Sequence, residues 1–491
     1  MSEMTSKPHA LVVPSPGMGH LIPLLELATC LATHHNFHAT VLVVSSNPSP
    51  ALSQVIQSAK AQNLLDIVEL PAPSGHDTNA AGSVFTHLPA IMRDVRSSLR
   101  SAISAMENKP SAMFVDLFGP AAFTVAEEFH MLKYVALGSA WTLSLLLYAP
   151  VLDKQIEGEY LDQKELLKIP GCKPVRPEDV VKPMMNRKDQ EYESFIRIGL
   201  EIPSMSDGIL INTWEDLEPT CLKTMREHPE WKKIVKIPLY SIGPMVRLAG
   251  QSGGGRRSEL LDWLDKQPGE SVLYISFGSG GVLSAEQIIE MAWGLEFSKQ
   301  RFIWVVQPPS RGGGGGAKGN DMSEYLPEGF MARTHDKGLV VTTWAPQSEI
   351  LAHSSVGGFL SHCGWNSALE SIMNGLPMIA WPLYAEQKMV ATLLVEELKV
   401  AIRPKVLPTK QVAGREEIEM LVRKIMEQTE GDAMRRRTKE LKASGEKALG
   451  VGGSSFIMLS ELSRLCKINT EQQCEKVGTA SNSRVGCCPC S

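Results

Sequence analysis

Short apolar runs alternate with helix-forming segments along most of this 491-residue chain. In the first half, the apolar runs cover residues 10–13, 37–45, 67–70, 112–117, 134–137 and 208–212. Helical patterns such as 21–33, 84–105 and 119–129 separate them. Strands that are apolar throughout belong to parallel sheets, which helices cover on both faces. The alternation therefore predicts a doubly wound α/β domain.

The alternation stops near residue 250 and then starts again. Residues 248–257, L-A-G-Q-S-G-G-G-R-R, have the composition of a flexible linker. Beyond them, strand patterns recur at 271–277, 302–306, 339–342, 356–360 and 378–380. We expect two Rossmann-like domains, 1–246 and 259–453, joined by a linker at 247–258 and followed by a helix at 454–468 and a flexible tail at 469–491. Because open α/β sheets bind ligands at the carboxyl ends of their strands, a cleft between the domains is the expected site.

Composition restricts the partners and the compartment. The net charge of −5 argues against a nucleic-acid partner, and 43% apolar with 21% charged residues describes a globular protein. The N-terminus lacks a basic start followed by a long apolar core, so no signal peptide is predicted. The longest apolar run, 140–152, is too short to span a bilayer. We expect a cytoplasmic enzyme without membrane insertion and, in the absence of heptads, a monomer.

The cysteines divide into two groups. Five are scattered through apparent core or motif segments, as is usual for buried thiols in a reducing compartment: Cys30, Cys172, Cys221, Cys363 and Cys466. The other four lie in the tail: Cys474, Cys487, Cys488 and Cys490. No histidine or paired spacing supports a metal site there, and prenylation of Cys488 stays open although Pro489 and Cys490 are poor aliphatic positions. We expect a tail without a catalytic role.

Residues 344–387 contain the strongest candidate for a ligand site. A strand at 356–360, a tight turn at 361–364 and a helix opening at Asn366 present the free N–H groups of a helix start to a ligand. Gly364 lets backbone approach closely, and His362 adds a donor, so a diphosphate can be held without a metal. Tryptophans and carboxylates around the turn suit a base, a ribose and a sugar. The pattern indicates a nucleotide sugar.

These 44 residues resemble the signature box of plant family 1 UDP-dependent glycosyltransferases. The likeness lies in the length, the opening W-A-P-Q, the central H-C-G-W-N-S and the closing Gln. Runs such as V-D-L-F-G and N-T-W-E-D-L-E-P are most similar to the hydroquinone and monolignol glucosyltransferase group. The resemblance implies the GT-B fold, in which the last helix returns to the first domain. It also implies an O-glucosyltransferase that uses UDP-glucose and small phenolic acceptors of hydroquinone, monolignol, phenylpropanoid or coumarin type.

The resemblance also assigns the donor site, residue by residue. The residues concerned are Ser279, Trp344, Ala345, Gln347, His362, Trp365, Asn366, Ser367, Glu370, Glu386 and Gln387. Trp344 would stack on uracil, and Gln347 with Glu370 would hold the ribose. His362, Asn366 and Ser367 would hold the diphosphate. Trp365, Glu386 and Gln387 would hold the sugar; Glu386 departs from the Asp that most relatives carry, whereas Gln387 matches glucose users. For Ser279, in S-F-G-S-G-G, a purely structural turn is the alternative.

His20 and Asp116 are the candidate catalytic pair. By itself, G-M-G-H lacks the third glycine of a dinucleotide fingerprint, His20 fits a helix start, and Asp116 fits a helix N-cap. The match of P-G-M-G-H-L-I-P to the family's catalytic loop implies that His20 is a general base and Asp116 its orienting carboxylate. Leu117 and Phe118 would then face the acceptor. The implied reaction is an in-line displacement with inversion, giving a β-glucoside, with UDP stabilised by the helix N-terminus rather than by a metal or other permanently bound cofactor.

Three alternatives stay open at this stage. The acceptor can belong to another class, such as a flavonoid or a terpenoid, because the segments 73–85 and 183–195 that set acceptor choice tolerate change. A non-catalytic protein that binds nucleotide sugars would need a misplaced His20 or Asp116. A retaining glycosidase would need two carboxylates facing one bond, and nothing marks such a pair. The glycine-rich run 311–320 is expected to be a mobile surface loop.

Overall fold

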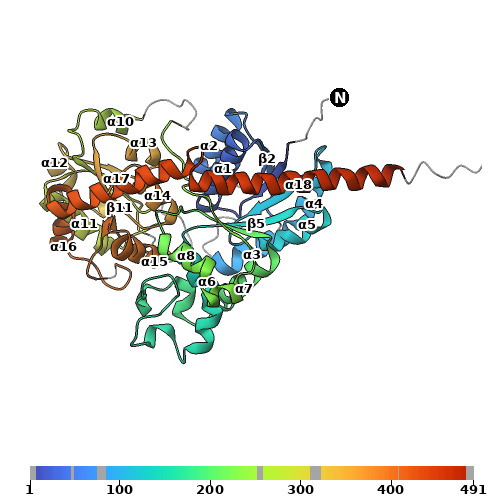
Figure 1. Ribbon diagram of the computed structural model, residues 1–491. Coiled ribbons are helices and arrows are strands. Elements are labelled where there is room, and N and C mark those ends of the chain that lie inside the picture. Colours follow the sequence, from blue (N-terminus) through green and yellow to red (C-terminus); the bar gives the residue numbers. More distant parts are fainter. Residues whose placement is uncertain are drawn as a thin grey trace, which may run out of the picture.

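A computed structural model describes residues 7–45, 49–73, 84–250, 258–309, 322–406 and 408–482. Two parallel sheets lie side by side in it, each with helices on both faces (Figure 1). The expected pair of doubly wound α/β domains is confirmed. Most of the predicted linker, the glycine-rich run 311–320 and the last cysteines, Cys487, Cys488 and Cys490, lie outside the described residues.

The first sheet has seven parallel strands in the order β3-β2-β1-β4-β5-β6-β7. The strands are β1 His9–Val13, β2 His38–Val44, β3 Asp66–Leu70, β4 Ala112–Val115, β5 Leu132–Leu137, β6 Gly208–Ile211 and β7 Leu239–Ser241. The central strands β1 and β4 are buried at every position. This is why they form continuous apolar runs without polar alternation.

The second sheet has six parallel strands in the order β10-β9-β8-β11-β12-β13. The strands are β8 Val272–Ser276, β9 Arg301–Val305, β10 Gly338–Val341, β11 Val356–Ser361, β12 Met378–Ala380 and β13 Ala401–Ile402. Strands β7 and β13 were not predicted, because three and two residues are too few to carry a periodic pattern.

The helices cover both sheets. In the first domain they are α1 Met18–His34, α2 Pro50–Ala61, α3 Val84–Asp94, α4 Arg96–Ala105, α5 Phe123–Glu128, α6 Ala140–Gln155, α7 Gln190–Met205, α8 Pro219–Glu227 and α9 Pro229–Ile234. After the linker they are α10 Glu259–Leu264, α11 Ala285–Ser298, α12 Phe330–Thr334, α13 Gln347–Leu351, α14 Trp365–Met373, α15 Gln387–Thr392, α16 Arg415–Glu427, α17 Thr429–Leu449 and α18 Ser454–Asn482. The helix expected at 84–105 is two helices, because the chain turns at Val95.

Both sheets reverse their strand order at one point. In the first sheet the reversal lies between β1 and β4, where Val13 pairs with Val115. In the second it lies between β8 and β11, where Ser276 pairs with Ser361. At such a point the connections after the two neighbouring strands run to opposite faces of the sheet. They leave a crevice at the carboxyl ends of the strands, which is where α/β proteins bind ligands.

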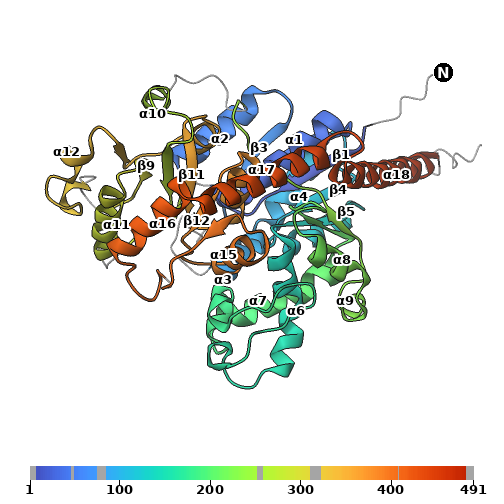
Figure 2. The ribbon, with the colours of Figure 1, turned by 60° about the vertical axis from the view of Figure 1, so that its left-hand side comes forward.

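Helix α18 is longer than expected. It continues to Asn482, so the predicted start of an unstructured tail at residue 469 is wrong for the described residues. The side chain of Asn469 donates to the Ser111 carbonyl at 2.8 Å, and that of Gln473 donates to the Phe129 carbonyl at 3.0 Å. These contacts with the first domain tie down the additional turns. In Figures 1 and 2, α18 lies along the first sheet.

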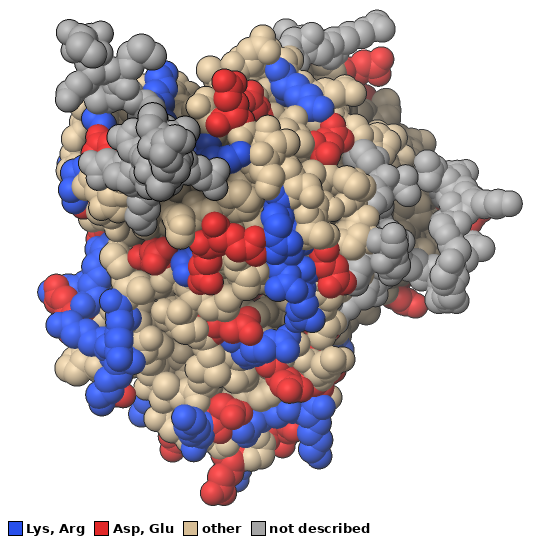
Figure 3. All heavy atoms as spheres, turned by 90° about the vertical axis from the view of Figure 1, so that its right-hand side faces the viewer, with Lys and Arg blue, Asp and Glu red and all other residues tan. Residues whose placement is uncertain are grey.

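The described surface carries charges of both signs. On the face drawn in Figure 3, Lys and Arg side chains lie among Asp and Glu side chains. Such mixing gives no extended basic surface on that face for a nucleic acid to follow. Among the described helices, none combines the length and the apolar content that a membrane crossing needs.

The packing of α18 predicts the effect of removing one of its buried side chains. Leu462 is 0% exposed, and it joins the core cluster beneath the first sheet. Replacing Leu462 with Ala should lower the free energy of unfolding of that domain by about 2–5 kcal/mol, as cavity-forming changes do. Chemical denaturation followed by circular dichroism measures it. Ile457, on the same helix but 53% exposed, is the control; equal losses for both alanine variants would contradict the docking of α18.

Candidate active site

His20 and Asp116 meet at the carboxyl ends of the adjacent strands β1 and β4. His20 lies in the first turn of α1, after a tight loop in which Gly17 has a φ of 122°. Asp116 follows directly after β4. The His20 Nδ1 atom is 2.8 Å from the Asp116 Oδ2 atom. The two residues predicted as a catalytic pair are therefore brought together, although 96 positions separate them in the chain.

The Asp116 carboxylate is almost fully enclosed, with 5% exposure. Ser15 donates to it through its backbone N–H at 3.2 Å and its hydroxyl at 2.6 Å, and the Phe118 N–H donates at 3.1 Å. Burial by itself would raise the pKa of Asp116, but His20 and these donors hold the pKa below its usual value. Asp116 is thus an ionised group. Ser15 was not predicted, because its partner Asp116 lies 101 positions further along the chain and no local pattern indicates the contact.

The same carboxylate determines the state of His20. Burial lowers the pKa of His20, but the charge and hydrogen bond of Asp116 raise it, and the net result is a pKa above 6.5. Because Nδ1 faces the carboxylate, the neutral imidazole carries its proton on Nδ1 and keeps a free lone pair on Nε2. His20 therefore has the tautomer and the raised basicity that a general base needs.

Aromatic rings continue outward from His20. The Phe118 ring lies 5.4 Å from the His20 ring, Phe85 lies 5.3 Å from Phe118, and Phe195 lies 5.6 Å from Phe85, all edge to face. Leu117 is only partly buried beside them. Phe118 was predicted at this place, whereas Phe85 on α3 and Phe195 on α7 were predicted only as members of variable segments. No local pattern in the sequence distinguishes their side chains.

The turn between β11 and α14 encloses His362. A Cβ atom on Gly278 would lie 2.7 Å from the His362 ring, and one on Gly364 would lie 2.6 Å from its Nε2 atom. Glycines at both places therefore let two backbone segments close around the imidazole. Burial lowers the pKa of His362 to about 4, so the ring is neutral at pH 7. Ser279 lies one residue beyond Gly278, in an exposed turn.

Three of the predicted donor residues form one hydrogen-bonded cluster. The Gln347 Nε2 atom donates to the Ser367 hydroxyl at 3.1 Å and to the Glu370 carboxylate at 2.5 Å. Burial raises the pKa of Glu370 to about 7, against the opposing effect of the hydrogen bond from Gln347. Trp344 stands beside this cluster in sequence with 55% of its surface exposed, and the next residue, Ala345, is buried. An exposed indole next to partly buried polar groups fits a stacked base and a ribose.

Glu386 ends the loop before α15, and Gln387 is the first residue of that helix. The Gln387 Oε1 atom accepts the N–H groups of Leu383 and Tyr384 at 2.9 and 3.0 Å, which fixes the side chain against the loop. Burial raises the pKa of Glu386, and its own backbone N–H and the nearby His20 oppose that rise. This electrostatic interaction joins a predicted sugar ligand in the second domain to the predicted base in the first.

Two side chains of the signature box donate hydrogen bonds to the first domain. The Asn366 Nδ2 atom donates to the Gly19 carbonyl at 3.0 Å, next to His20. The Trp365 indole N–H donates to the Asn212 carbonyl at 2.8 Å. The amide hydrogen of Asn366 and the indole hydrogen of Trp365 are therefore used between the domains. Sequence reasoning placed both residues on the donor and did not foresee this second use.

A metal ion has no evident protein ligands in the described part of the chain. No group of three or more His, Cys, Asp or Glu side chains is placed there to hold one. The helix start at Trp365 and the neutral His362 lie at the turn after β11, where the sequence predicts an anion site.

Comparison with known proteins identifies the family. Residues 257–410 match the family model for UDP-glucoronosyl and UDP-glucosyl transferases. Anthocyanidin 3-O-glucosyltransferase 5 of Manihot esculenta is 52% identical over 469 residues, which cover 94% of this chain and 96% of that protein. The chain belongs to the plant family 1 UDP-glycosyltransferases. The hydroquinone glucosyltransferase of Rauvolfia serpentina is 43% identical to this glycosyltransferase over 472 residues, which cover 94% of this chain and 98% of that one.

A solved structure supports the fold and the donor. The crystal structure of Medicago truncatula UGT71G1 with UDP-glucose matches this glycosyltransferase with a TM-score of 0.81 and 30% identity, over 95% of this chain and 100% of that one. The predicted family, the GT-B fold and the enzyme class are confirmed. Binding of a UDP-sugar donor is supported by this complex, and the location of the donor site stays a prediction.

The close packing around His362 predicts a sensitive glycine. Gly278 has a φ of +71° and no room for a Cβ, so Gly278→Ala adds strain and displaces His362. Strain of about 1–3 kcal/mol corresponds to UDP binding at least fivefold weaker. Isothermal titration calorimetry with UDP measures it. Gly269→Ala, whose new Cβ would have its nearest neighbour at 3.8 Å, is the control and should bind UDP normally. Equal affinity of both variants would contradict the enclosure of His362.

Proposed function

We propose that this enzyme transfers glucose from UDP-glucose to the hydroxyl group of small phenols, with inversion at the anomeric carbon. The observation that carries the proposal is the 2.8 Å contact between His20 and Asp116 at the end of the sheet nearest the donor box. Its link to the donor side is the 3.0 Å hydrogen bond from Asn366 to the carbonyl beside His20. A rival without turnover would need one of the pair to be misplaced, and their geometry argues against that.

The chemistry is a single displacement. The His20 Nε2 atom takes the phenol proton while the phenol oxygen attacks the anomeric carbon from the face opposite UDP. The new C–O bond forms as the bond from that carbon to the phosphate oxygen breaks, and its electron pair leaves with UDP. Asp116 stabilises the imidazolium that results, and the proton then passes to water. The product is a β-glucoside.

The leaving group needs compensation for its charge, and we assign this to the protein. The start of α14 offers unpaired N–H groups and the positive end of the helix dipole, with Ser367 and the neutral His362 as further donors. Trp344 would stack on uracil while Gln347 and Glu370 hold the ribose. Glu386 and Gln387 would hold the glucose hydroxyls. The charge of Glu386 interacts with that of His20, and Gln387 is the next residue along the chain. With this arrangement, transfer requires no metal, so EDTA should leave the rate unchanged.

The aromatic wall supports a phenolic acceptor. Phe118 lies edge to face with His20, and Phe85 and Phe195 continue the aromatic cluster behind it, so the surroundings of the base suit a flat aromatic substrate better than a flexible alcohol. A phenol has a pKa of about 10, far closer to that of histidine than an aliphatic alcohol has. The relative from Manihot, by its name, acts on an anthocyanidin, so a flavonoid is the second candidate class of acceptor.

Turnover tests the proposal directly. UDP release should require both UDP-glucose and a phenol, and the panel is hydroquinone, vanillin, coniferyl alcohol, scopoletin and a flavonol. His20→Ala should lower kcat/KM by about 10²–10⁴ because it removes the base. His34→Ala, an exposed histidine at the other end of α1, is the matched control and should keep full activity. Phenol-dependent release of UDP at the parent rate in His20→Ala would refute the mechanism. Release of UDP with the flavonol but with none of the small phenols would favour the second class of acceptor.

The pair also predicts a pH profile. His20 must be neutral to accept a proton, and its pKa is raised above 6.5. We therefore expect kcat/KM to rise with pH, with a midpoint above pH 6.5, and then to level off. Asp116→Asn removes the largest effect that raises this pKa, whereas burial, which lowers it, and the smaller raising effect of Glu386 remain. The rise should therefore move to lower pH, and the plateau should fall by about 10-fold or more. Profiles of kcat/KM against pH measure both effects, and an unchanged midpoint would contradict the coupling.

A further inference from the structure

A segment of the first domain contacts the loop that precedes α15 and contains Ala385 and Glu386. Residues 173–185, which we call the strap, run past α15 and the turn that follows it. The Lys182 backbone N–H donates to the Ala385 carbonyl at 3.1 Å. At the other end of the strap, the Lys173 ammonium donates to the Glu396 carbonyl at 2.6 Å. The strap therefore contacts the second domain on both sides of α15.

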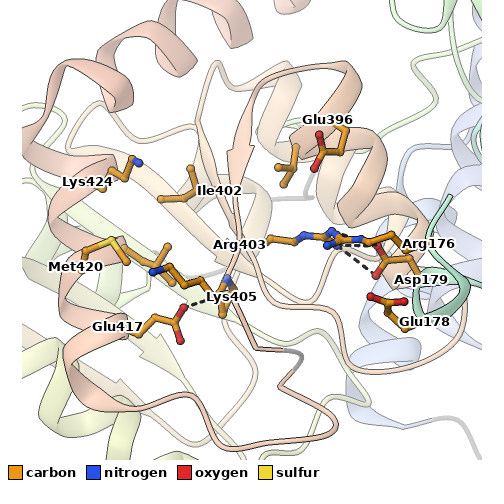
Figure 4. A pocket seen from close by; sticks show the side chains of 13 residues that line it. Arg176, Glu178, Asp179, Glu396, Ile402, Arg403, Lys405, Glu417, Met420 and Lys424 are labelled. Carbon is orange, nitrogen blue, oxygen red and sulfur yellow. Dashed lines mark hydrogen bonds and ion pairs between the residues drawn. The ribbon is translucent and has the colours of Figure 1, made fainter. Parts of the chain in front are cut away.

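Asp179 is the buried centre of the strap. Its side chain is 0% exposed and receives the Thr392 hydroxyl at 3.0 Å, the Arg403 guanidinium at 3.1 Å and the Arg176 Nε atom at 2.9 Å. Figure 4 shows Arg403 reaching from the end of β13 to Asp179 and Arg176. A buried carboxylate with this many donors fixes their relative positions, because losing one donor leaves uncompensated charge.

A cavity of about 390 Å³ opens on the other side of Arg403. Figure 4 shows Glu417, Met420 and Lys424 of α16 across it, away from the guanidinium. None of the predicted donor or acceptor residues lines this cavity. The Arg403 guanidinium donates to Asp179 of the strap and to the Thr392 hydroxyl of α15.

The loop that the strap contacts has an unfavourable backbone. Ala385 has a φ of +53°, in the left-handed region that costs a residue with a Cβ about 1 kcal/mol or more. This residue directly precedes Glu386 and Gln387. Its carbonyl is the group that accepts from Lys182, so the strap stabilises the peptide whose conformation aims both side chains. Thr392, held by Asp179, ends the helix that Gln387 begins.

We propose that the strap is a positioning device for the donor sugar: Asp179 and the Lys182 N–H set the reach of Glu386 and Gln387 and thereby the affinity for the hexose. The inference rests on the proposed role of those two residues as sugar ligands. It makes Asp179 and Lys182 positioning residues, since neither is placed to touch substrate. The uridine and diphosphate contacts come from other elements, α13 and α14, which the strap does not hold.

A matched pair of variants at one position tests the strap. Lys182→Pro removes the N–H that Ala385 accepts, and Lys182→Ala keeps it. Proline is tolerated here because Lys182 opens a short 3-10 helix and Val181 has φ −64° and ψ 152°, the conformation favoured before proline. Lys182→Pro should raise the KM for UDP-glucose about tenfold, the equivalent of one lost hydrogen bond, and leave the Kd of UDP within about twofold. Lys182→Ala should match the parent in both.

A second variant covers the case in which the proline disturbs folding. Asp179→Asn keeps the size of the side chain and removes its charge, and it should change the ratio of kcat/KM for UDP-glucose to that for UDP-galactose about threefold or more. A purely structural defect would lower kcat/KM for UDP-glucose and UDP-galactose by the same factor and would also weaken the binding of UDP. That outcome would overturn the inference. An unchanged KM and donor ratio in Lys182→Pro and Asp179→Asn would overturn it too.

Glu386→Gln separates this inference from the proposed function. If Glu386→Gln raises the KM for UDP-glucose while the strap variants do not, the sugar site stands and the positioning role alone fails. If Glu386→Gln leaves that KM unchanged, the sugar assignment fails first, and the strap has no site to position. If Glu386→Gln and Lys182→Pro both raise the KM with UDP binding preserved, both proposals are supported.

Discussion

The buried carboxylate of Asp116 is the group on which the acceptor side of the site depends. A carboxylate with almost no exposure stays ionised only if donors occupy its oxygens. Those donors come from three places: the loop after β1 through Ser15, the turn after β4 through Phe118, and α1 through His20. Satisfying one charge therefore fixes the relative positions of three segments. The position of the imidazole follows from that requirement.

The two domains use the same topological device for different chemistry. Each places its functional turn where the strand order reverses, so that backbone N–H groups and side chains gather at the carboxyl ends of parallel strands. In the first domain the groups converge on the Asp116 carboxylate and His20, and in the second they form the turn to which we assign the diphosphate. The hydrogen bond from Asn366 to Gly19 joins the two turns. Because Asn366 lies in the first turn of α14, this hydrogen bond fixes the start of that helix relative to the loop that carries His20.

What could be predicted follows from what local sequence encodes. Continuous apolar runs indicated the strands, and the ends of those strands located Asp116 and the turn at His362. Tertiary contacts determine the rest. Phe85 and Phe195 join the aromatic cluster beside His20 because α3 and α7 pack together, and no periodicity in the sequence indicates that contact. The additional turns of α18 and the strap were unforeseen for the same reason: their partners are carbonyl groups far away in the chain.

His20 is partly exposed and His362 is buried, and their opposite pKa shifts show the effect of a carboxylate partner. Burial lowers the pKa of both His20 and His362. His20 has a carboxylate partner, Asp116, whose charge reverses the shift, whereas His362 stays neutral down to about pH 4. As the pH falls from 7, His20 therefore becomes protonated first, while His362 still presents a neutral ring to the anion site. The proposed base is lost to acid before His362 is protonated, because the carboxylate at the end of β4 opposes the effect of burial on His20, and burial alone sets the direction of the pKa shift at His362.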